Sequence, residues 1–418
     1  MARSPRKPFI RAWSLRLAER RGLIHTWSLR LAEKWGFIHT RNLRLAEKRG
    51  LILVLVWLLT IVAILPAIFH WQAAPPRIGH AAHLQLDVGY LFGLLICYGI
   101  YRAEKRRLPK RQAFAIAFLV LLLVGVTDTL HLFNVDRVSI FRERSNLAWQ
   151  IEVENQVIQL STSVLPHSYR FLPNSIVRWM QLVGMSYETA RDIYRLIFNL
   201  LLFYAIYRYA RLYTSYTGAI LAMALIAVIY PVGFVYNAGQ LTDPLSHLSF
   251  VLAFIFLETG DFGFFISTLL IGSLAKETVL ALAGYYLLFC RKDNRYVPKA
   301  ALLCSLAFAV YFGVRFWVLR GGIGYGQISG VALSHAWSNW QNGRWPPLVA
   351  LTAGALLPFL ILTWKETPLP LKRQALFLLP VLFISGTFFS WLFESHNFMP
   401  LVFVLAVVAG RYLAEARM

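Results

Sequence analysis

The sequence predicts an all-α membrane protein, a polytopic bundle of transmembrane helices. Of its 418 residues, 58% are hydrophobic and only 15% are charged. The hydrophobic residues gather in blocks of about 17–22, the length at which a helix crosses the ~30 Å hydrocarbon core of a bilayer. The basic residues lie in short segments between these blocks. We therefore expect about ten spans plus one short helical hairpin.

The net charge of +22 raises the question of nucleic-acid binding. A nucleic-acid-binding protein gathers its basic residues on one face of a folded domain. Here they occupy the segments that connect hydrophobic blocks, which is the distribution that the positive-inside rule describes for cytoplasmic loops. We therefore expect membrane lipids as partners and no nucleic acid.

The N-terminal segment, residues 1–50, is expected to be a separate basic segment in the cytoplasm. Residues 12–53 contain one 14-residue unit three times, and each copy mixes Leu with basic residues. Such a mixture suits a helix that lies in the cytoplasmic headgroup layer. A recent duplication without a role of its own is the alternative. The rest of the chain, residues 51–418, is expected to form the multi-spanning membrane domain.

The predicted spans follow from the hydrophobic blocks. They cover residues 51–69, 84–101, 113–133, 193–209, 217–236, 244–258, 300–319, 347–364, 374–392 and 398–414. The Lys- and Arg-rich loop at 102–111 is the strongest cytoplasmic marker. Counting from it, both termini are cytoplasmic and the long loop 134–192 lies outside. We expect the plasma membrane of a bacterial cell as the location.

Residues 262–290 are too long for one span and carry Lys276 and Glu277 at their middle. A charge at the centre of a lone lipid-facing helix costs ~2.5–3.5 kcal/mol or more. Two short helices joined around Ser273–Thr278 avoid that cost, and they keep the later basic turns in the cytoplasm. We therefore predict a helical hairpin here.

This topology places four polar segments on the outer face. They are the loop 134–192, the turn Gln240–Asp243, the loop 320–346 and the turn 393–397. The third of these carries Trp337, Trp340 and Trp345. Their rings are suited either to stack on a sugar or to lie in the aromatic belt at the membrane interface.

Chemistry-bearing residues are densest in the first outer loop. Glu152 and Glu154 form its acidic pair, and His167, Arg170 and Arg178 follow. Arg binds phosphate oxygens in a bidentate manner, and a carboxylate serves as a general base or a divalent-metal ligand. This composition favours a lipid-phosphate substrate. The alternative is an amphipathic helix on the outer leaflet whose Arg residues bind lipid headgroups.

The order of features from about residue 113 to 414 resembles the GT-C superfamily of membrane glycosyltransferases, which take sugars from polyprenyl-phosphate donors. An acidic outer loop is followed by SYRFLPNSIVRWM, then by QLTDP at the start of a later span. GSLAKETVLAL in the predicted hairpin and ESHNFMPLVFVLA before the last span complete the pattern. The resemblance implies a GT-C-like bundle and a lipid-linked sugar donor as partner.

The same resemblance implies roles for individual residues. Glu154 is its best match for the catalytic acidic residue, and Glu152 is second. Arg170, with His167 or His396, would hold the donor phosphate. Further substrate-binding or framework roles fall to Asp243, Glu277 and Glu394. Asp243 has a structural alternative as a cap of the span that starts at Pro244, and Glu277 has one as the partner of Lys276.

A second group of residues points to different chemistry. His80, His83 and Asp87 are spaced i, i+3 and i+7, on one helical face, and Asp128 and His131 are spaced i, i+3. If the second and third spans pack together, these imidazoles and carboxylates would suit a transition metal such as Zn or Fe. The same residues would also suit a path for cations or protons.

The leading hypothesis is an inverting glycosyltransferase of the GT-C type that acts at the outer face. In this mechanism Glu154 activates the acceptor hydroxyl or holds a divalent metal, while Arg170 stabilises the departing lipid phosphate. A cation- or proton-coupled transporter is the second hypothesis, and a non-catalytic membrane protein is the third. The sequence does not identify the cofactor, the sugar, the acceptor or the oligomeric state.

Overall fold

The computed structural model describes residues 81–136, 147–233, 241–293, 295–321 and 333–415. Every regular element in these ranges is a helix, which confirms the all-α class. Six stretches among them are long and apolar enough to cross a membrane. These observations identify the chain as an integral membrane protein. The N-terminal repeats and the span predicted at 51–69 lie outside the described residues, so the count of ten spans stays a prediction.

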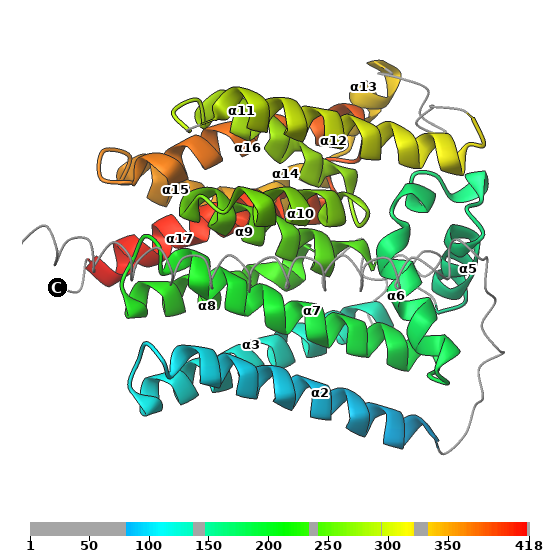
Figure 1. Ribbon diagram of the computed structural model, residues 1–418, viewed down its shortest axis with the longest axis horizontal. Helices are drawn as coiled ribbons and strands as arrows, with labels where there is room; N and C mark the ends of the chain where they lie inside the picture. The colour runs from blue at the N-terminus through cyan, green and yellow to red at the C-terminus, as the bar shows by residue number, and fades with distance from the viewer. Residues whose placement is uncertain (1–80, 137–146, 234–240, 294, 322–332, 416–418) are drawn as a thin grey trace, which may run out of the picture. The chain divides into compact units, whose positions relative to one another are not determined.

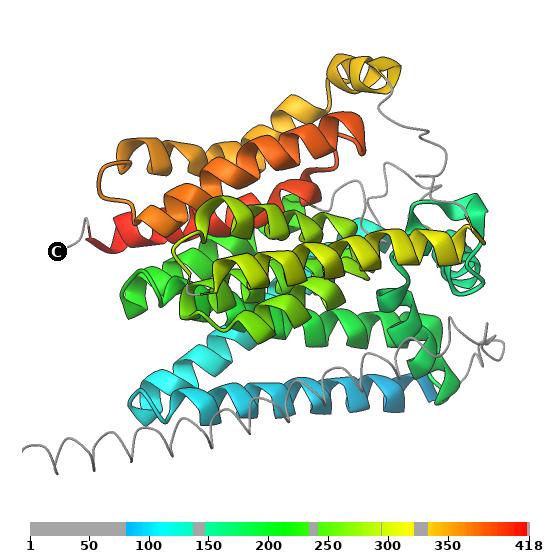
Figure 2. The same cartoon turned by 45° about the horizontal axis from the view of Figure 1, so that its top comes forward.

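The helices pack in a bundle whose long members run along a common direction (Figures 1 and 2). One side of the bundle holds α2 (Ala81–Glu104), α3 (Lys110–Asp136), α7 (Tyr187–Ala210) and α8 (Tyr216–Gly233). The middle holds α9 (Thr242–Thr259) and α17 (Met399–Glu415), and the other side holds α12 (Tyr296–Val318), α14 (Trp345–Val349), α15 (Ala355–Leu362) and α16 (Leu369–Phe388). A π-helical turn, Ala350–Gly354, joins α14 to α15.

The predicted helical hairpin is present. It consists of α10 (Phe262–Ser273), a 3-10 turn η3 (Glu277–Leu280) and α11 (Ala281–Phe289). The rings of Phe262 and Phe265, near the start of α10, contact Tyr286 near the end of α11, with centroids 5.3 and 6.0 Å apart. The two helices are therefore antiparallel. The hairpin begins and ends at one end of the bundle, and its charged tip lies inside the bundle.

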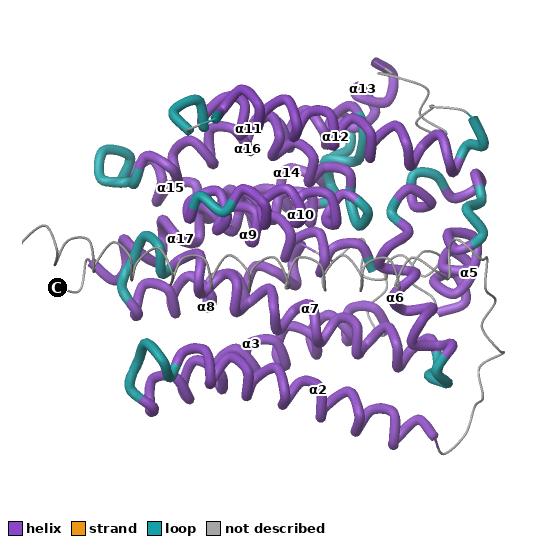
Figure 3. The backbone as a smooth tube through the Cα atoms, viewed as in Figure 1, coloured by secondary structure: helices purple, strands orange, loops and turns teal. Residues whose placement is uncertain are grey.

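The two ends of the bundle differ in their residues. The loops 105–109, 211–215, 290–293 and 363–368, which carry most of the connecting Lys and Arg residues, lie together at one end (Figure 3). We call this end the basic end. Two short helices, α5 (Leu147–Ile158) and α6 (Phe171–Leu182), lie at the opposite end (Figure 1). We call that one the α6 end.

The most extensive helix pairing in the described residues is that of α8 with α17, and it depends on two glycines. A Cβ atom built on Gly410 of α17 would overlap the carbonyl oxygen of Gly218 in α8 and stand 2.9 Å from the backbone nitrogen of Ala222. Small residues of this kind let two helix backbones approach closely in membrane bundles. Gly218 and Gly410 thus allow α8 and α17 to pack closely near the basic end of the bundle.

We expect the substitution Gly410→Ala to lower the free energy of unfolding by about 1–3 kcal/mol, the usual cost of overpacking. Gly125 in α3 is the matched control because nothing lies within 4 Å of a Cβ built there. Gly125→Ala should leave stability unchanged or raise it slightly, since Ala favours a helix over Gly by up to ~1 kcal/mol. Unfolding in detergent micelles measures both variants, and equal stability would contradict the close packing.

Candidate functional site

A buried ion pair joins the hairpin tip to the start of α9. Lys276 donates a hydrogen bond from Nζ to Oδ1 of Asp243 over 3.0 Å, and both side chains are at most 5% exposed. His396 lies in the 3-10 turn η5 (Ser395–Phe398) that leads into α17, and its Nε2 is 3.9 Å from the same carboxylate oxygen. Three segments far apart in the sequence therefore meet at Asp243.

A second pair joins the same tip to the start of α6. Arg170 donates from Nε and Nη2 to the two carboxylate oxygens of Glu277, over 2.9 and 2.8 Å. A backbone hydrogen bond of 3.2 Å from the Leu172 N–H to the Leu274 carbonyl lies beside this pair. The guanidinium of Arg315 in α12 covers the Tyr169 ring, 4.6 Å from its centroid. The segment before α6 is thus bound firmly to the hairpin and to α12.

The backbone at the tip explains how two adjacent charges find different partners. Lys276 has an extended backbone, with φ −161° and ψ 119°, between two helical segments. Successive side chains of an extended chain point in opposite directions. Lys276 therefore points toward α9 while Glu277 points toward α6.

Glu154 lies apart from these pairs, on α5. Its Oε2 is 3.4 Å from Nη2 of Arg178, and its Oε1 accepts a hydrogen bond from Gln181. The side chain is 1% exposed, and burial raises the pKa of the carboxyl from 4.5 to about 7, although Arg178 and Gln181 act in the opposite direction. Glu154 can therefore accept or release a proton near neutral pH.

A small pocket at the α6 end lies between the surroundings of Glu154 and those of Asp243. Trp149, Gln150 and Val153 of α5 form one wall, and the other lining residues are His167, Asn174, Tyr187, Leu241 and Thr242. Val153 and Thr242 immediately precede the two acidic residues. The lining combines the rings of a Trp and a Tyr with four further hydrogen-bonding side chains: an imidazole, two carboxamides and a hydroxyl.

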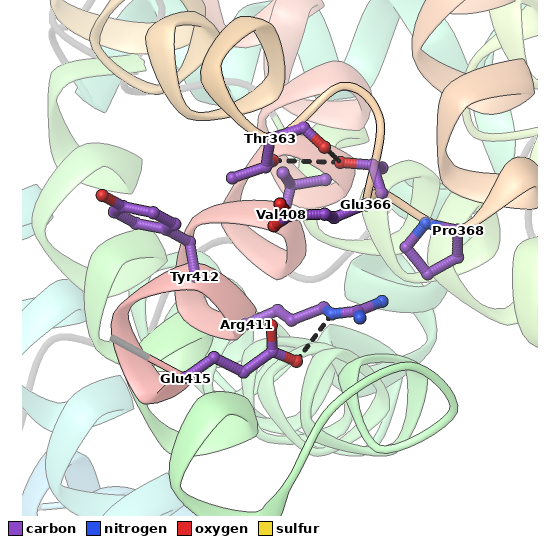
Figure 4. Close-up of a pocket in the computed structure, with 8 residues that line it drawn as sticks. Thr363, Glu366, Pro368, Val408, Arg411, Tyr412 and Glu415 are labelled. Atoms are coloured by element: carbon purple, nitrogen blue, oxygen red, sulfur yellow. Dashed lines mark hydrogen bonds and ion pairs between the residues drawn. The ribbon is translucent and has the colours of Figure 1, made fainter. Parts of the chain in front are cut away.

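A second pocket lies at the basic end, between the 363–368 turn and the last turns of α17 (Figure 4). Arg411 and Glu415 line it and bind each other over 2.8 Å. It contains none of the residues that the sequence analysis selected. It therefore serves below as a source of control variants.

The structure separates the two catalytic candidates. Glu154 is buried, whereas Glu152 is exposed and accepts a hydrogen bond from Gln156 on the same helix. Among the substrate-binding candidates, Arg170, Asp243, Glu277 and His396 converge on the hairpin tip, and His167 lines the pocket. Glu394 accepts hydrogen bonds from Ser390 (2.8 Å) and Asn397 (3.2 Å) and so closes its own turn.

The sequence analysis missed Gln150, Asn174 and Tyr187, which line the pocket. The spacing held a signal for Gln150, because it lies four residues before Glu154, and residues four apart are neighbours on the surface of a helix if the segment is helical. Asn174 and Tyr187 had no such signal, since their placement depends on how α6 and α7 pack.

The predicted metal cluster is only partly covered by the structure. Asp128 accepts a 2.6 Å hydrogen bond from Asn199 of α7. His80, and the side chains of His83, Asp87 and His131, lie outside the described residues. Among the residues whose side chains are described, no group of three His, Cys, Asp or Glu is arranged to hold a metal ion.

A divalent metal does not fit the two buried acidic residues at the α6 end. Arg178 lies against Glu154 and Lys276 against Asp243, so each carboxylate already faces a cation. A metal ion would be repelled by these side chains at short range. The two carboxylates therefore do not form a divalent-metal site in this arrangement.

No protein-family model matches the sequence, and neither curated proteins nor solved structures give a significant match.

We expect the substitution Lys276→Met to destabilise the protein by about 3–5 kcal/mol, because it leaves the buried Asp243 carboxylate without its cation. The double variant Asp243→Asn with Lys276→Met should regain much of that loss. The control is Arg411→Met at the more exposed Arg411–Glu415 pair, where less than about 1 kcal/mol should be lost. A double-mutant cycle on unfolding free energies measures the coupling, and its absence would contradict the pair.

Stability should fall as pH rises through the range in which Glu154 titrates. The folded state holds a proton up to about pH 7 that the unfolded state releases near pH 4.5. The free energy of unfolding therefore decreases across that window, by roughly 3 kcal/mol in total. Glu154→Gln should remove this contribution to the slope, while Glu152→Gln on the exposed side of the same helix should keep it. Thermal unfolding between pH 4 and 8 distinguishes them.

Proposed function

We propose that this protein is an inverting membrane glycosyltransferase that moves a sugar from a polyprenyl-phosphate donor to an acceptor at the α6 end. The pocket lining carries the proposal. Aromatic rings such as those of Trp149 and Tyr187 pack against the C–H faces of a sugar, and the polar groups of Gln150, His167 and Asn174 suit its hydroxyls. The pocket lies beside a buried carboxylate and near a guanidinium, which are the further groups that sugar transfer from a phosphate requires.

Arg170 is the proposed phosphate ligand. Its backbone N–H bonds to the carbonyl of His167 over 2.9 Å, so it stands within one turn of the pocket wall. The guanidinium of Arg170 already binds the carboxylate of Glu277 in a bidentate manner. Two phosphate oxygens can accept hydrogen bonds from the same pair of guanidinium N–H groups. The donor phosphate would therefore compete with Glu277 for Arg170.

The lipid part of the donor has a matching surface on α6. Trp179 and Leu182 are exposed there, three residues apart on one face of the helix, and Val183 just after the helix is exposed as well. Asn174, at the other end of the same helix, lines the pocket. A polyprenyl chain packed on this face would lead its phosphate toward the pocket.

Glu154 is the proposed general base. The acceptor oxygen attacks the anomeric carbon, and the bond from that carbon to the phosphate oxygen breaks. The lipid phosphate leaves with the electron pair, and Arg170 stabilises its charge. The acceptor proton passes to Glu154, directly or through the pocket lining, and a pKa of about 7 suits this step at neutral pH.

The proposal includes an orientation in the membrane. The basic end carries the Lys- and Arg-rich loops, and such loops stay in the cytoplasm. The α6 end and its pocket would then face outward across a bacterial plasma membrane, where a lipid-linked donor and its acceptor meet.

Binding of a short-chain polyprenyl-phosphate monosaccharide, compared with the bare polyprenyl phosphate, tests the proposal on the full-length protein in nanodiscs. Wild type should prefer the sugar-bearing lipid. Trp149→Ala should reduce that preference by about fivefold to tenfold through loss of one stacking contact, and Arg170→Ala should weaken both lipids. Glu366→Ala, in the pocket at the basic end, is the control and should change neither.

The same binding measurement can contradict the proposal. Wild type that binds neither lipid, or binds both with equal affinity, removes the support for a sugar site. Circular dichroism and gel filtration on each variant separate loss of binding from loss of folding. Transfer of labelled sugar, lost in Glu154→Gln but retained in Glu152→Gln, would identify the base.

A further inference from the structure

The short helix α13 (Leu333–Gln341) buries the polar residue Asn339 and exposes its large apolar side chains. Asn339 is fully buried, whereas Leu333 is 76%, Trp337 66% and Trp340 47% exposed. A surface helix in water shows the reverse arrangement.

Hydrogen bonds explain the buried face. Asn339 donates from Nδ2 to the carbonyl oxygens of Gly386 and Ser390, each over 2.8 Å, and its Oδ1 accepts from the Leu392 N–H over 2.8 Å. His335 donates from Nε2 to the Ser390 carbonyl over 2.8 Å. Because the last carbonyls of a helix have no partner within it, α13 completes the C-terminal end of α16.

The remaining surface of α13 divides into two exposed strips of opposite polarity. At about 100° per residue, Leu333, Trp337 and Trp340 fall on one strip. The polar residues Ser334, Ser338 and Gln341 fall on the next strip around the helix, and they are exposed as well. A helix that lies in the plane of a bilayer interface has this pattern, with one strip among acyl chains and the other in water.

The apolar strip continues a surface that already faces lipid. The ring of Trp340 meets the edge of Phe383 in α16, with centroids 5.5 Å apart. Along α16, one of the candidate membrane spans, Leu376, Leu379 and Ile384 are exposed. The strip and this flank therefore form one apolar surface that turns from the span onto α13.

We infer that α13 lies in the interfacial layer of the leaflet at the α6 end, with Leu333, Trp337 and Trp340 inserted among the acyl chains. The partner of this surface is the lipid bilayer itself. Through Asn339 the helix holds the turn that follows α16. This turn leads to His396, so contact with lipid at α13 helps to fix one side of the ion-pair cluster.

Nitroxide labels on single cysteines test this inference in the full-length protein. The background replaces Cys97, Cys290 and Cys304, and the protein is placed in vesicles of phosphatidylcholine and phosphatidylglycerol. Labels at Leu333→Cys and Trp337→Cys should be relaxed more by oxygen than by a water-soluble nickel chelate. Labels at Ser334→Cys and Ser338→Cys, on the same helix, are the matched controls and should show the opposite ratio.

Equal oxygen-to-nickel ratios on the two strips would overturn the inference, because α13 would then not be oriented by lipid. Labels at 333 and 337 that are shielded from both reagents would also overturn it, since a protein surface would then cover the strip. Spectral broadening that disappears on dilution with unlabelled protein would identify that surface as a second copy of the chain.

Discussion

Lys276 and Glu277 are adjacent charges at the tip of the helical hairpin, and each is held by a different part of the chain. Lys276 binds Asp243 at the start of α9, and Glu277 binds Arg170 at the start of α6. A buried charge without a partner is costly, so the hairpin, α9 and α6 have to be in place together. The pocket at the α6 end is bordered by the last two of these segments, and its form therefore depends on both ion pairs.

The two buried carboxylates of this region have different surroundings and thus different capacities. Asp243 is bound to a Lys side chain, which stabilises its ionised form, so it suits a fixed framework charge. Burial dominates at Glu154, which places its pKa near neutrality. Environments that separate two acidic residues in this way are typical of sites in which only one of them transfers protons. The proposed division of roles follows from this difference.

The polarity of the surface follows the position along the bundle. The basic loops lie at one end, the spans expose large apolar side chains, and Trp residues are exposed near both ends, among them Trp364 in the 363–368 turn and Trp337 in α13. In α13, His335 and Asn339 turn inward and bond to the end of α16, while Trp337 and Trp340 turn outward. The Trp rings turn outward because they face lipid, and the polar side chains turn inward because the backbone carbonyls at the end of α16 need hydrogen-bond donors.

The sequence by itself determined the membrane class, the all-α fold and the hairpin, because block length and the cost of a central charge are local properties. It also selected both Glu152 and Glu154, and only the family resemblance ranked Glu154 first. Two residues apart on a helix, they point to different sides, and only packing against α6 decides which one is buried. The pair Arg170–Glu277 spans 107 residues of sequence. Tertiary structure alone decided such pairs, since they depend on which helices become neighbours.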